Sequence, residues 1–288
     1  IQVSTGATEM GQGVNTKMRQ IVAEAFAIEP TQVMVMATST EKNHNTSPTA
    51  ASSGTDINGS ATLIACNKIK QRLAACAAEH FKKPVRGTLE EIEINEHQNY
   101  DQIIFEKGRV YDQANPKDSI SFNELVSMAF LNRISLSGYG FYKIPGIGFD
   151  KEKGQGHPFH YFTNGVAVSE VLIDRFTGEL KVQRADILMD LGRPINEAID
   201  HGQVSGAFIQ GMGWVTTENL IYSDQGHLLS HSPTTYKIPN IQDTPREFNI
   251  ELLANQEHKN VRGSKAVGEP PLLLGLSVWA AVKNALSY

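Results

Sequence analysis

Residues 263–272 read GSKAVGEPPL and place Glu269 between a glycine and two prolines, just ahead of an apolar run. Proline is favoured in the first turn of a helix, because its missing N–H is one that would lack a partner there anyway. We therefore expect a helix over residues 270–286 with Glu269 at its start. Such a glutamate is either a partner of the helix dipole or a catalytic base. A base also needs burial to raise its pKa against that dipole, and local physics leaves the choice open.

Upstream of this turn, helical and extended patterns alternate. The spacing of apolar residues predicts helices over residues 16–28, 57–81, 122–130 and 194–211. Alternating patterns predict strands over residues 1–4, 31–37, 165–173, 179–189, 214–221 and 248–253, with a hairpin over 102–111. Residues 39–55 and 139–160 read as loops. We expect an α+β fold with mixed or antiparallel sheets and packed helices, in two subdomains over residues 1–150 and 151–288.

The composition excludes several classes of protein. Hydrophobic residues make up 40% and charged residues 20% of the 288, as in ordinary globular proteins. The net charge of -5 argues against a nucleic-acid partner, and no apolar run reaches the length of a membrane span. Cys66 and Cys76 are too few for a disulfide framework or for an iron–sulfur cluster, and they suit a reducing cytoplasm. Because the chain opens on Ile1 and stops within a helical pattern, we expect part of a larger protein with an incomplete site.

Two loops precede predicted helices and could bind a ligand. Residues 5–13 read TGATEMGQG, where glycines allow close approach and a helix N-terminus offers N–H donors to an anion. They match neither the dinucleotide fingerprint nor a P-loop, and a tight turn is the alternative. Residues 47–56 read SPTAASSGTD, whose amides and hydroxyls could wrap a phosphate or a larger polar cofactor. The alternative there is a capping loop with Thr55 or Asp56 as N-cap.

A third segment, residues 206–213, reads GAFIQGMG and sets Gln210 in a small and apolar helix end. The alternative is a glycine-rich C-cap with an exposed glutamine. The histidines show no zinc-site spacing. None of these segments alone identifies a function.

In combination and in this order, the segments resemble the molybdenum-binding subunit or domain of the xanthine dehydrogenase family of molybdenum hydroxylases. The matching runs are TEMGQG at 8–13, SPTAAS at 47–52, PFHYF at 158–162, GQVSGAFIQG at 202–211, TTYKIP at 234–239 and KAVGEPP at 265–271. The resemblance covers nearly the whole chain. It is closer to xanthine dehydrogenases than to aldehyde oxidases or carbon monoxide dehydrogenases.

The resemblance implies a molybdenum ion carried by molybdopterin and a fold of the xanthine dehydrogenase/aldehyde oxidase type. Glu269 matches the family's general base. The backbone of Ala51 would lie close to the metal, and no side chain of this chain is expected to bind the metal directly. The other positions that match cofactor contacts are Met10, Gly11, Gln12, Ser52, Ser53, Thr55 and Gln210.

The implied activity is the oxidative hydroxylation of hypoxanthine or xanthine to urate, with oxygen taken from water. The alternatives are an aldehyde oxidase, another N-heterocycle hydroxylase, or a cofactor-free fragment or assembly module that is inactive by itself. The family's substrate clamp lies in an N-terminal half of the molybdenum domain with no match here. The 2Fe-2S and FAD groups belong to partner domains or subunits. We expect the full enzyme to be a cytoplasmic homo-oligomer, whose electron acceptor (NAD or oxygen) the sequence does not identify.

Overall fold

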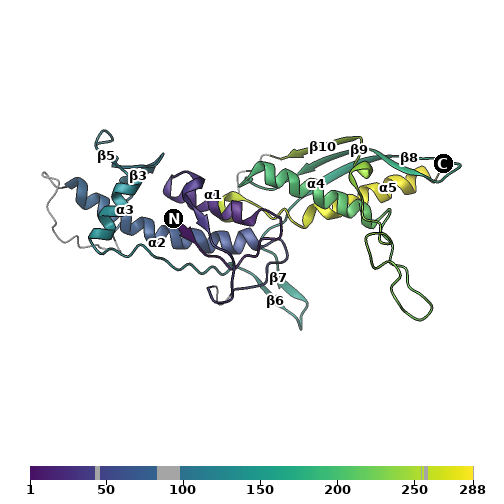
Figure 1. The fold of residues 1–288 in the computed structure, drawn as a ribbon, viewed down its shortest axis with the longest axis horizontal. Helices are drawn as coiled ribbons and strands as arrows, with labels where there is room; N and C mark the ends of the chain where they lie inside the picture. The colour runs from purple at the N-terminus through teal and green to yellow at the C-terminus, as the bar shows by residue number, and fades with distance from the viewer. Residues whose placement is uncertain (43–45, 83–97, 254, 256–258, 288) are drawn as a thin grey trace. The chain divides into compact units, whose positions relative to one another are not determined.

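The structure is a computed structural model that describes residues 1–42, 46–82, 98–253, 255 and 259–287 (Figure 1). It divides into two compact units, which are described separately. Unit 1 comprises Ile1–Ala50 and Gly54–Pro145, and unit 2 comprises Ala51–Ser53 and Gly146–Tyr288. The subdomain limits predicted at residue 150 stay a prediction. Both units combine helices and sheets, so the predicted α+β class is confirmed.

Unit 1 is built around one long helix. Its elements are β1 (Gln2–Val3), α1 (Val14–Phe26), η1 (Pro30–Gln32), β2 (Met34–Val35), α2 (Gly54–Lys82), β3 (Ile103–Glu106), β4 (Arg109–Asp112), β5 (Ser119–Ser121) and α3 (Phe122–Leu131). The short strands β1 and β2 pair in parallel, and β3, β4 and β5 form an antiparallel sheet. The 29 residues of α2 give α1, α3 and the small sheet one common surface to pack on.

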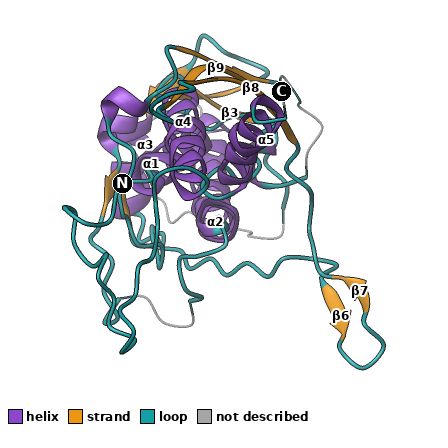
Figure 2. Ribbon diagram, turned by 90° about the vertical axis from the view of Figure 1, so that its right-hand side faces the viewer, coloured by secondary structure: helices purple, strands orange, loops and turns teal. Residues whose placement is uncertain are grey.

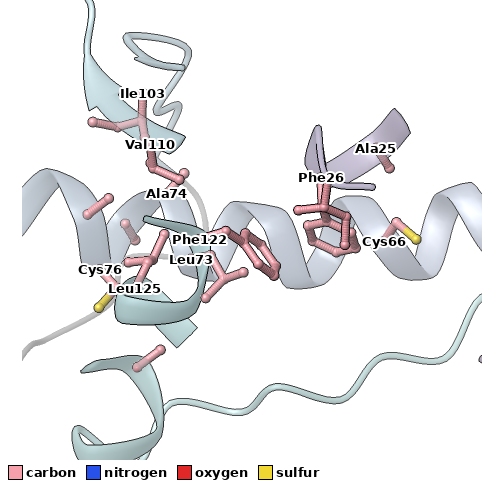
Figure 3. Packing of buried hydrophobic residues seen from close by; sticks show 14 of the residues in the cluster. Ala25, Phe26, Cys66, Leu73, Ala74, Cys76, Ile103, Val110, Phe122 and Leu125 are labelled. Carbon is pink, nitrogen blue, oxygen red and sulfur yellow. The ribbon is translucent and has the colours of Figure 1, made fainter. Parts of the chain in front are cut away.

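Apolar side chains from α1, α3 and the small sheet β3–β5 meet along α2 (Figure 3). The rings of Phe26 and Phe122 lie 5.6 Å apart, and Leu73 and Leu125 are fully buried. Both cysteines are buried on α2 and form no disulfide, and burial raises the pKa of the Cys76 thiol to about 11. A thiol with so high a pKa is a packing group and not a nucleophile at neutral pH.

Unit 2 is a three-stranded sheet covered by helices on one face. Its elements are β6 (Gly148–Asp150), β7 (Gln155–His157), β8 (Gly165–Ile173), β9 (Leu180–Met189), α4 (Glu197–Trp214), η2 (Ile241–Asp243), β10 (Glu247–Leu252), η3 (Val261–Gly263), η4 (Pro270–Gly275) and α5 (Leu276–Ala285). The strand order is β10-β9-β8, with β8 antiparallel and β10 parallel to β9. Strands β6 and β7 form a separate, exposed hairpin.

The inner face of this sheet follows a period of two. Ala185, Ile187 and Met189 on β9 are buried, whereas Arg184 directly before them and Leu188 between the last two are exposed. Helices α4 and α5 lie side by side against the buried face (Figure 2). The mixed sheet therefore presents one apolar face, and the helices that cover it carry Gln210 and follow Glu269.

Several predicted elements differ from the structure. The strand expected over 214–221 is wrong, because α4 runs to Trp214 and the amides of Thr216, Thr217 and Glu218 all bind the carbonyl of Gly213. The strand over 31–37 shrinks to β2, and the connector over 139–160 contains the β6–β7 hairpin. The loop over 39–55 ends where α2 begins, and its residues 43–45 lie outside the described part. The helix over 270–286 starts as the 3-10 turn η4 and continues as α5.

Candidate functional site

Glu269 lies directly before η4, with its backbone held and its carboxylate left uncapped. Its N–H donates to Ser52 Oγ at 2.7 Å, and its carbonyl accepts from the N–H of Leu272 at 3.0 Å. The side chain makes no capping hydrogen bond to η4 and is exposed in this chain. A capping hydrogen bond is therefore not the reason for a glutamate here, and attraction of its charge to the helix dipole stays the alternative to a base.

The two prolines explain why no cap forms. An N-cap side chain accepts from the second or third N–H of its helix. The second residue of η4 is Pro271, which has no N–H, and the third, Leu272, already donates to the carbonyl of Glu269. The sequence EPPL thus removes the donors that would bind the carboxylate, while it fixes the turn that carries it.

The partner of Glu269 comes from a short stretch with an unusual backbone. Ala51 and Ser52 are consecutive non-glycine residues in the left-handed region, at φ 55° and 52°. Such conformations cost on the order of 1–3 kcal/mol each and persist only where the surroundings enforce them. A Cβ on Gly268 would lie 3.1 Å from Ser52 Oγ, so the two segments approach closely here. Two motifs 217 residues apart in sequence are thereby joined by one hydrogen bond.

Gln210 lies on α4, one residue before the closest crossing of α4 and η4. A Cβ on Gly211 would lie 2.0 Å from the carbonyl oxygen of Leu272, and one on Gly275 would lie 2.5 Å from the carbonyl carbon of Gly211. Only glycine at both positions permits this backbone contact. Because α4 continues to Trp214, Gln210 is not at a C-cap, and that alternative is wrong. Its side chain is exposed.

The TGATEMGQG loop of unit 1 is closed by its own glutamate. The N–H groups of Gly11, Gly13 and Asn15 all donate to the Glu9 carboxylate at 2.9 Å. Burial acts to raise the pKa of Glu9, but these backbone hydrogen bonds outweigh it and hold that pKa below its ordinary value. The donors at the start of α1, which the sequence offered to an external anion, are used by Glu9.

The rest of this loop is also bound internally. The N–H of Met10 donates to Gln12 Oε1 at 2.6 Å, and Gln12 Nε2 donates to the carbonyl of Thr8 at 2.8 Å. The N–H of Thr8 donates to Thr49 Oγ1 at 2.9 Å. The loop is preformed, with the Met10 side chain 70% exposed. Contacts of Met10, Gly11 and Gln12 with a pterin stay a prediction.

The predicted site residues therefore fall into two groups. Unit 2 brings Ser52 to Glu269, with Ser53 next along the chain and Gln210 on the helix that packs against η4. Met10, Gly11, Gln12 and Thr55 belong to unit 1. Because α2 begins at Gly54, Thr55 and Asp56 lie inside its first turn, and neither is the N-cap that the alternative reading expected.

Sequence reasoning missed two contacts that hold the segment before Glu269. Asp190 pairs with Lys265, and the hydroxyl of Tyr161 accepts from the N–H of Ala266 at 2.8 Å. Lys265 and Tyr161 each lie in a quoted motif, but no local pattern indicates that either reaches its partner. Asp190 directly follows β9, and only the fold shows that Lys265 lies beside it.

Unit 1 also contains a cavity of about 1040 Å³, bounded by α1, α2, the start of α3 and residues 136–144. None of the predicted site residues lines it. Within the described ranges, no three His, Cys, Asp or Glu side chains gather as a metal site would require. No helix in those ranges combines the length and the apolar character that crossing a membrane demands.

Comparisons with known proteins give relatives that match along the whole chain. The xanthine dehydrogenase of Dictyostelium discoideum is 41% identical over 291 residues, which cover 100% of this chain and 19% of that protein. The xanthine dehydrogenase/oxidase of Felis catus is 44% identical over 287 residues, covering 99% of this chain and 19% of that protein. The chain thus spans about a fifth of the length of these curated relatives.

Solved structures share the fold. Quinoline 2-oxidoreductase from Pseudomonas putida 86 superposes with a TM-score of 0.80 at 24% identity, over 99% of this chain and 34% of that one. CO dehydrogenase from Oligotropha carboxidovorans gives a TM-score of 0.78 at 22% identity, over 98% of this chain and 32% of that one. The family model described as "molybdopterin cofactor-binding domain" matches residues 1–245. The motif resemblance is therefore confirmed, and the chain belongs to the molybdopterin cofactor-binding domain family.

Proposed function

We propose that this chain forms one wall of the active site of a molybdenum hydroxylase, with Glu269 as its general base. The observation that carries the proposal is the state of Glu269. Its backbone is fixed by Ser52 and by two prolines, while its carboxylate has no capping bond to the helix that follows. Membership of the molybdopterin cofactor-binding domain family supplies the chemical context.

The residues present fit a molybdenum–pterin group. The family description supplies molybdopterin as the carrier of the metal, with the Ala51 backbone expected nearby. Ser52 Oγ accepts from Glu269 and keeps its own proton to donate, since a hydroxyl both donates and accepts. In unit 2, Ser52, Ser53 and Gln210 would hold the group. The pterin contacts of Met10, Gly11, Gln12 and Thr55 in unit 1 are a separate prediction from the family resemblance.

When bound, such a group supplies the redox chemistry, accepting two electrons from the substrate. Glu269 supplies a proton acceptor at a fixed position: its carboxylate takes the proton from the water-derived oxygen that attacks the substrate carbon. Holding a base in place contributes typically ~10²–10⁴-fold to a rate. Glu269 is exposed in this chain. The burial that a base needs would therefore come from the cofactor and from polypeptide outside this chain.

We favour a purine substrate, hypoxanthine or xanthine, with urate as the final product. The support is that relatives 40–44% identical along the whole of this chain are named xanthine dehydrogenase or xanthine dehydrogenase/oxidase. An aldehyde or another N-heterocycle is the alternative. The substrate clamp, a 2Fe-2S cluster and FAD would lie in the remaining four-fifths of a protein like these relatives, within a cytoplasmic homo-oligomer. The isolated chain would be inactive.

The test uses the full-length protein that contains this chain. We expect stoichiometric molybdenum and releasable pterin, and faster oxidation of hypoxanthine than of aldehydes. We expect Glu269→Gln to keep the metal and to lose turnover by ~10²–10⁴-fold. Glu197→Gln is the matched control, because Glu197 is an exposed glutamate in the first turn of α4. Active protein without molybdenum, or full turnover by Glu269→Gln, would overturn the proposal.

A further inference from the structure

Four residues before Glu269, a buried ion pair joins its segment to the end of β9. Lys265 Nζ lies 2.5 Å from Asp190 Oδ2, and their side chains are only 7% and 9% exposed. Asp190 Oδ1 also accepts from the N–H of Gly192 at 2.9 Å, and Oδ2 accepts from Asn255 Nδ2 at 3.3 Å. Every acceptor oxygen of this carboxylate is therefore engaged by a donor that faces it.

The backbones of the two segments are joined at the same place. Gly192 and Ser264 form an antiparallel bridge, the N–H of Lys265 donates to the carbonyl of Leu191 at 2.8 Å, and that of Arg193 donates to the carbonyl of Gly263 at 2.7 Å. Gly192 has φ +63°, and a Cβ there would lie 2.2 Å from the carbonyl oxygen of Gly263. The contact is close, specific and independent of the residues assigned to the cofactor.

Between Lys265 and Glu269 the chain is held at three more points. The N–H of Ala266 donates to the Tyr161 hydroxyl at 2.8 Å, Val267 is buried in the core of unit 2, and the N–H of Glu269 donates to Ser52. Lys265 and Glu269 are four Cα–Cα steps of about 3.8 Å apart along the chain. A displacement of Lys265 is therefore close enough to reach Glu269 through this anchored segment.

A buried ion pair is in general no more stabilising than an apolar pair of similar shape, but it tolerates few alternative arrangements. We infer that Asp190 and Lys265 are positioning residues, which hold the 263–269 segment in the register that places Glu269 for proton transfer. The inference rests on the proposed role of Glu269. Misplacing a catalytic group by about 1 Å can cost ~10²-fold in rate, so the predicted effect on turnover is measurable.

The experiment compares Lys265→Met with Lys265→Arg in the full-length protein. Methionine keeps the apolar stem and loses the charge, whereas arginine keeps the cation. Arg184→Met is the matched control, because it removes exposed ion pairs on the same sheet, with Asp186 and Glu247. Should Lys265→Met fail to fold, Asp190→Asn replaces it, since an amide oxygen can still accept from Gly192. The readouts are amide hydrogen exchange of residues 265–269 in cofactor-free protein, and kcat and KM per bound molybdenum.

We expect Lys265→Met to speed exchange at residues 265–269 at least tenfold while β8 and β9 keep their protection. We expect kcat to fall by roughly 10–100-fold with KM within about threefold, partial recovery in Lys265→Arg, and no change in Arg184→Met. Unchanged exchange together with unchanged kcat in folded Lys265→Met would overturn the inference. If Glu269→Gln keeps full turnover, the base assignment fails, and exchange alone then decides whether the pair fixes the segment.

Discussion

Two glutamates at helix starts, Glu9 in unit 1 and Glu269 in unit 2, are used in opposite ways. Glu9 accepts three backbone N–H groups around the first turn of α1 and closes its own loop. Glu269 makes no capping bond, because the residues after it are prolines, while Ser52 and a glycine crossing hold its backbone. The difference shows how the residues after a glutamate decide whether a helix binds its carboxylate. At Glu269 the prolines remove the capping donors of η4, while main-chain hydrogen bonds fix the backbone.

Substitution at the backbone crossing of α4 and η4 should lower the free energy of unfolding of unit 2 more than any other change below. Gly211→Ala would drive a Cβ to within 2.0 Å of the carbonyl oxygen of Leu272. Overpacking of this kind costs typically 1–3 kcal/mol, and we expect about 3 kcal/mol here because the obstacle is backbone. Gly206→Ala in the same helix meets no atom within 4 Å and should stabilise by up to about 1 kcal/mol. Urea unfolding of both variants checks this, and equal stabilities would show that the crossing is not tight.

Restoring a donor should make Glu269 behave more like Glu9. Pro271→Ala returns the N–H at the second position of η4, where an N-cap carboxylate is bound. We expect capture of the carboxylate and a loss of roughly tenfold in turnover, which corresponds to about 1.4 kcal/mol. Pro270→Ala returns an N–H that N-cap side chains do not use, so its effect should be smaller. Steady-state kinetics per bound molybdenum separates the two, and equal effects would contradict the donor argument.

Weakening the closure around Glu9 should cost stability. Glu9→Gln removes the charge that the first turn of α1 binds, and we expect a loss of about 1 kcal/mol, typical of a lost cap. Asn15 donates to the same carboxylate, so exchange of its amide should accelerate in this variant. Exchange unchanged from the natural protein would mean that the three hydrogen bonds do not close the loop.

The same interaction has a pH dependence with a defined sign. Because the pKa of Glu9 is lower in the folded chain than its ordinary value of 4.5, its stabilisation is fully present above that value. It is lost as the pH falls through the folded pKa, where both states are protonated. The difference in unfolding free energy between the natural protein and Glu9→Gln should therefore be constant near neutrality and shrink below about pH 4.5. A difference that grows on acidification would reverse the assignment.

The sequence anticipates much of this fold for local reasons. The hairpin of β8 and β9 follows from alternating apolar residues around Thr177 and Gly178, and α2 follows from its apolar spacing. The parallel pairing of β10 with β9 has no local signal, because it joins segments that are far apart in sequence. The strand predicted over 214–221 is wrong because the β-branched run Val215–Thr217 has its amides bound to the last carbonyls of α4.

For the site, the sequence predicted individual residues better than the contacts between them. Glu269, Ser52 and Gln210 were all predicted, and the structure joins the first two and places the third on the helix that contacts η4. Their motifs are short and carry glycine and proline, whose backbone effects are readable locally. The Asp190–Lys265 pair was missed, because a contact across 75 residues depends on the completed fold. The internal closure by Glu9 was missed too, since a loop sequence does not show where its amides point.

The opposite use of the two glutamates is tested most directly by making the same substitution at both. Glu9→Gln and Glu269→Gln are compared in the full-length protein for unfolding free energy and for turnover per bound molybdenum. We predict that Glu9→Gln loses about 1 kcal/mol, that Glu269→Gln stays within about 0.5 kcal/mol of the natural protein, and that Glu269→Gln loses turnover by ~10²–10⁴-fold. A Glu269→Gln variant that is destabilised as much as Glu9→Gln, or that turns over normally, would contradict this account.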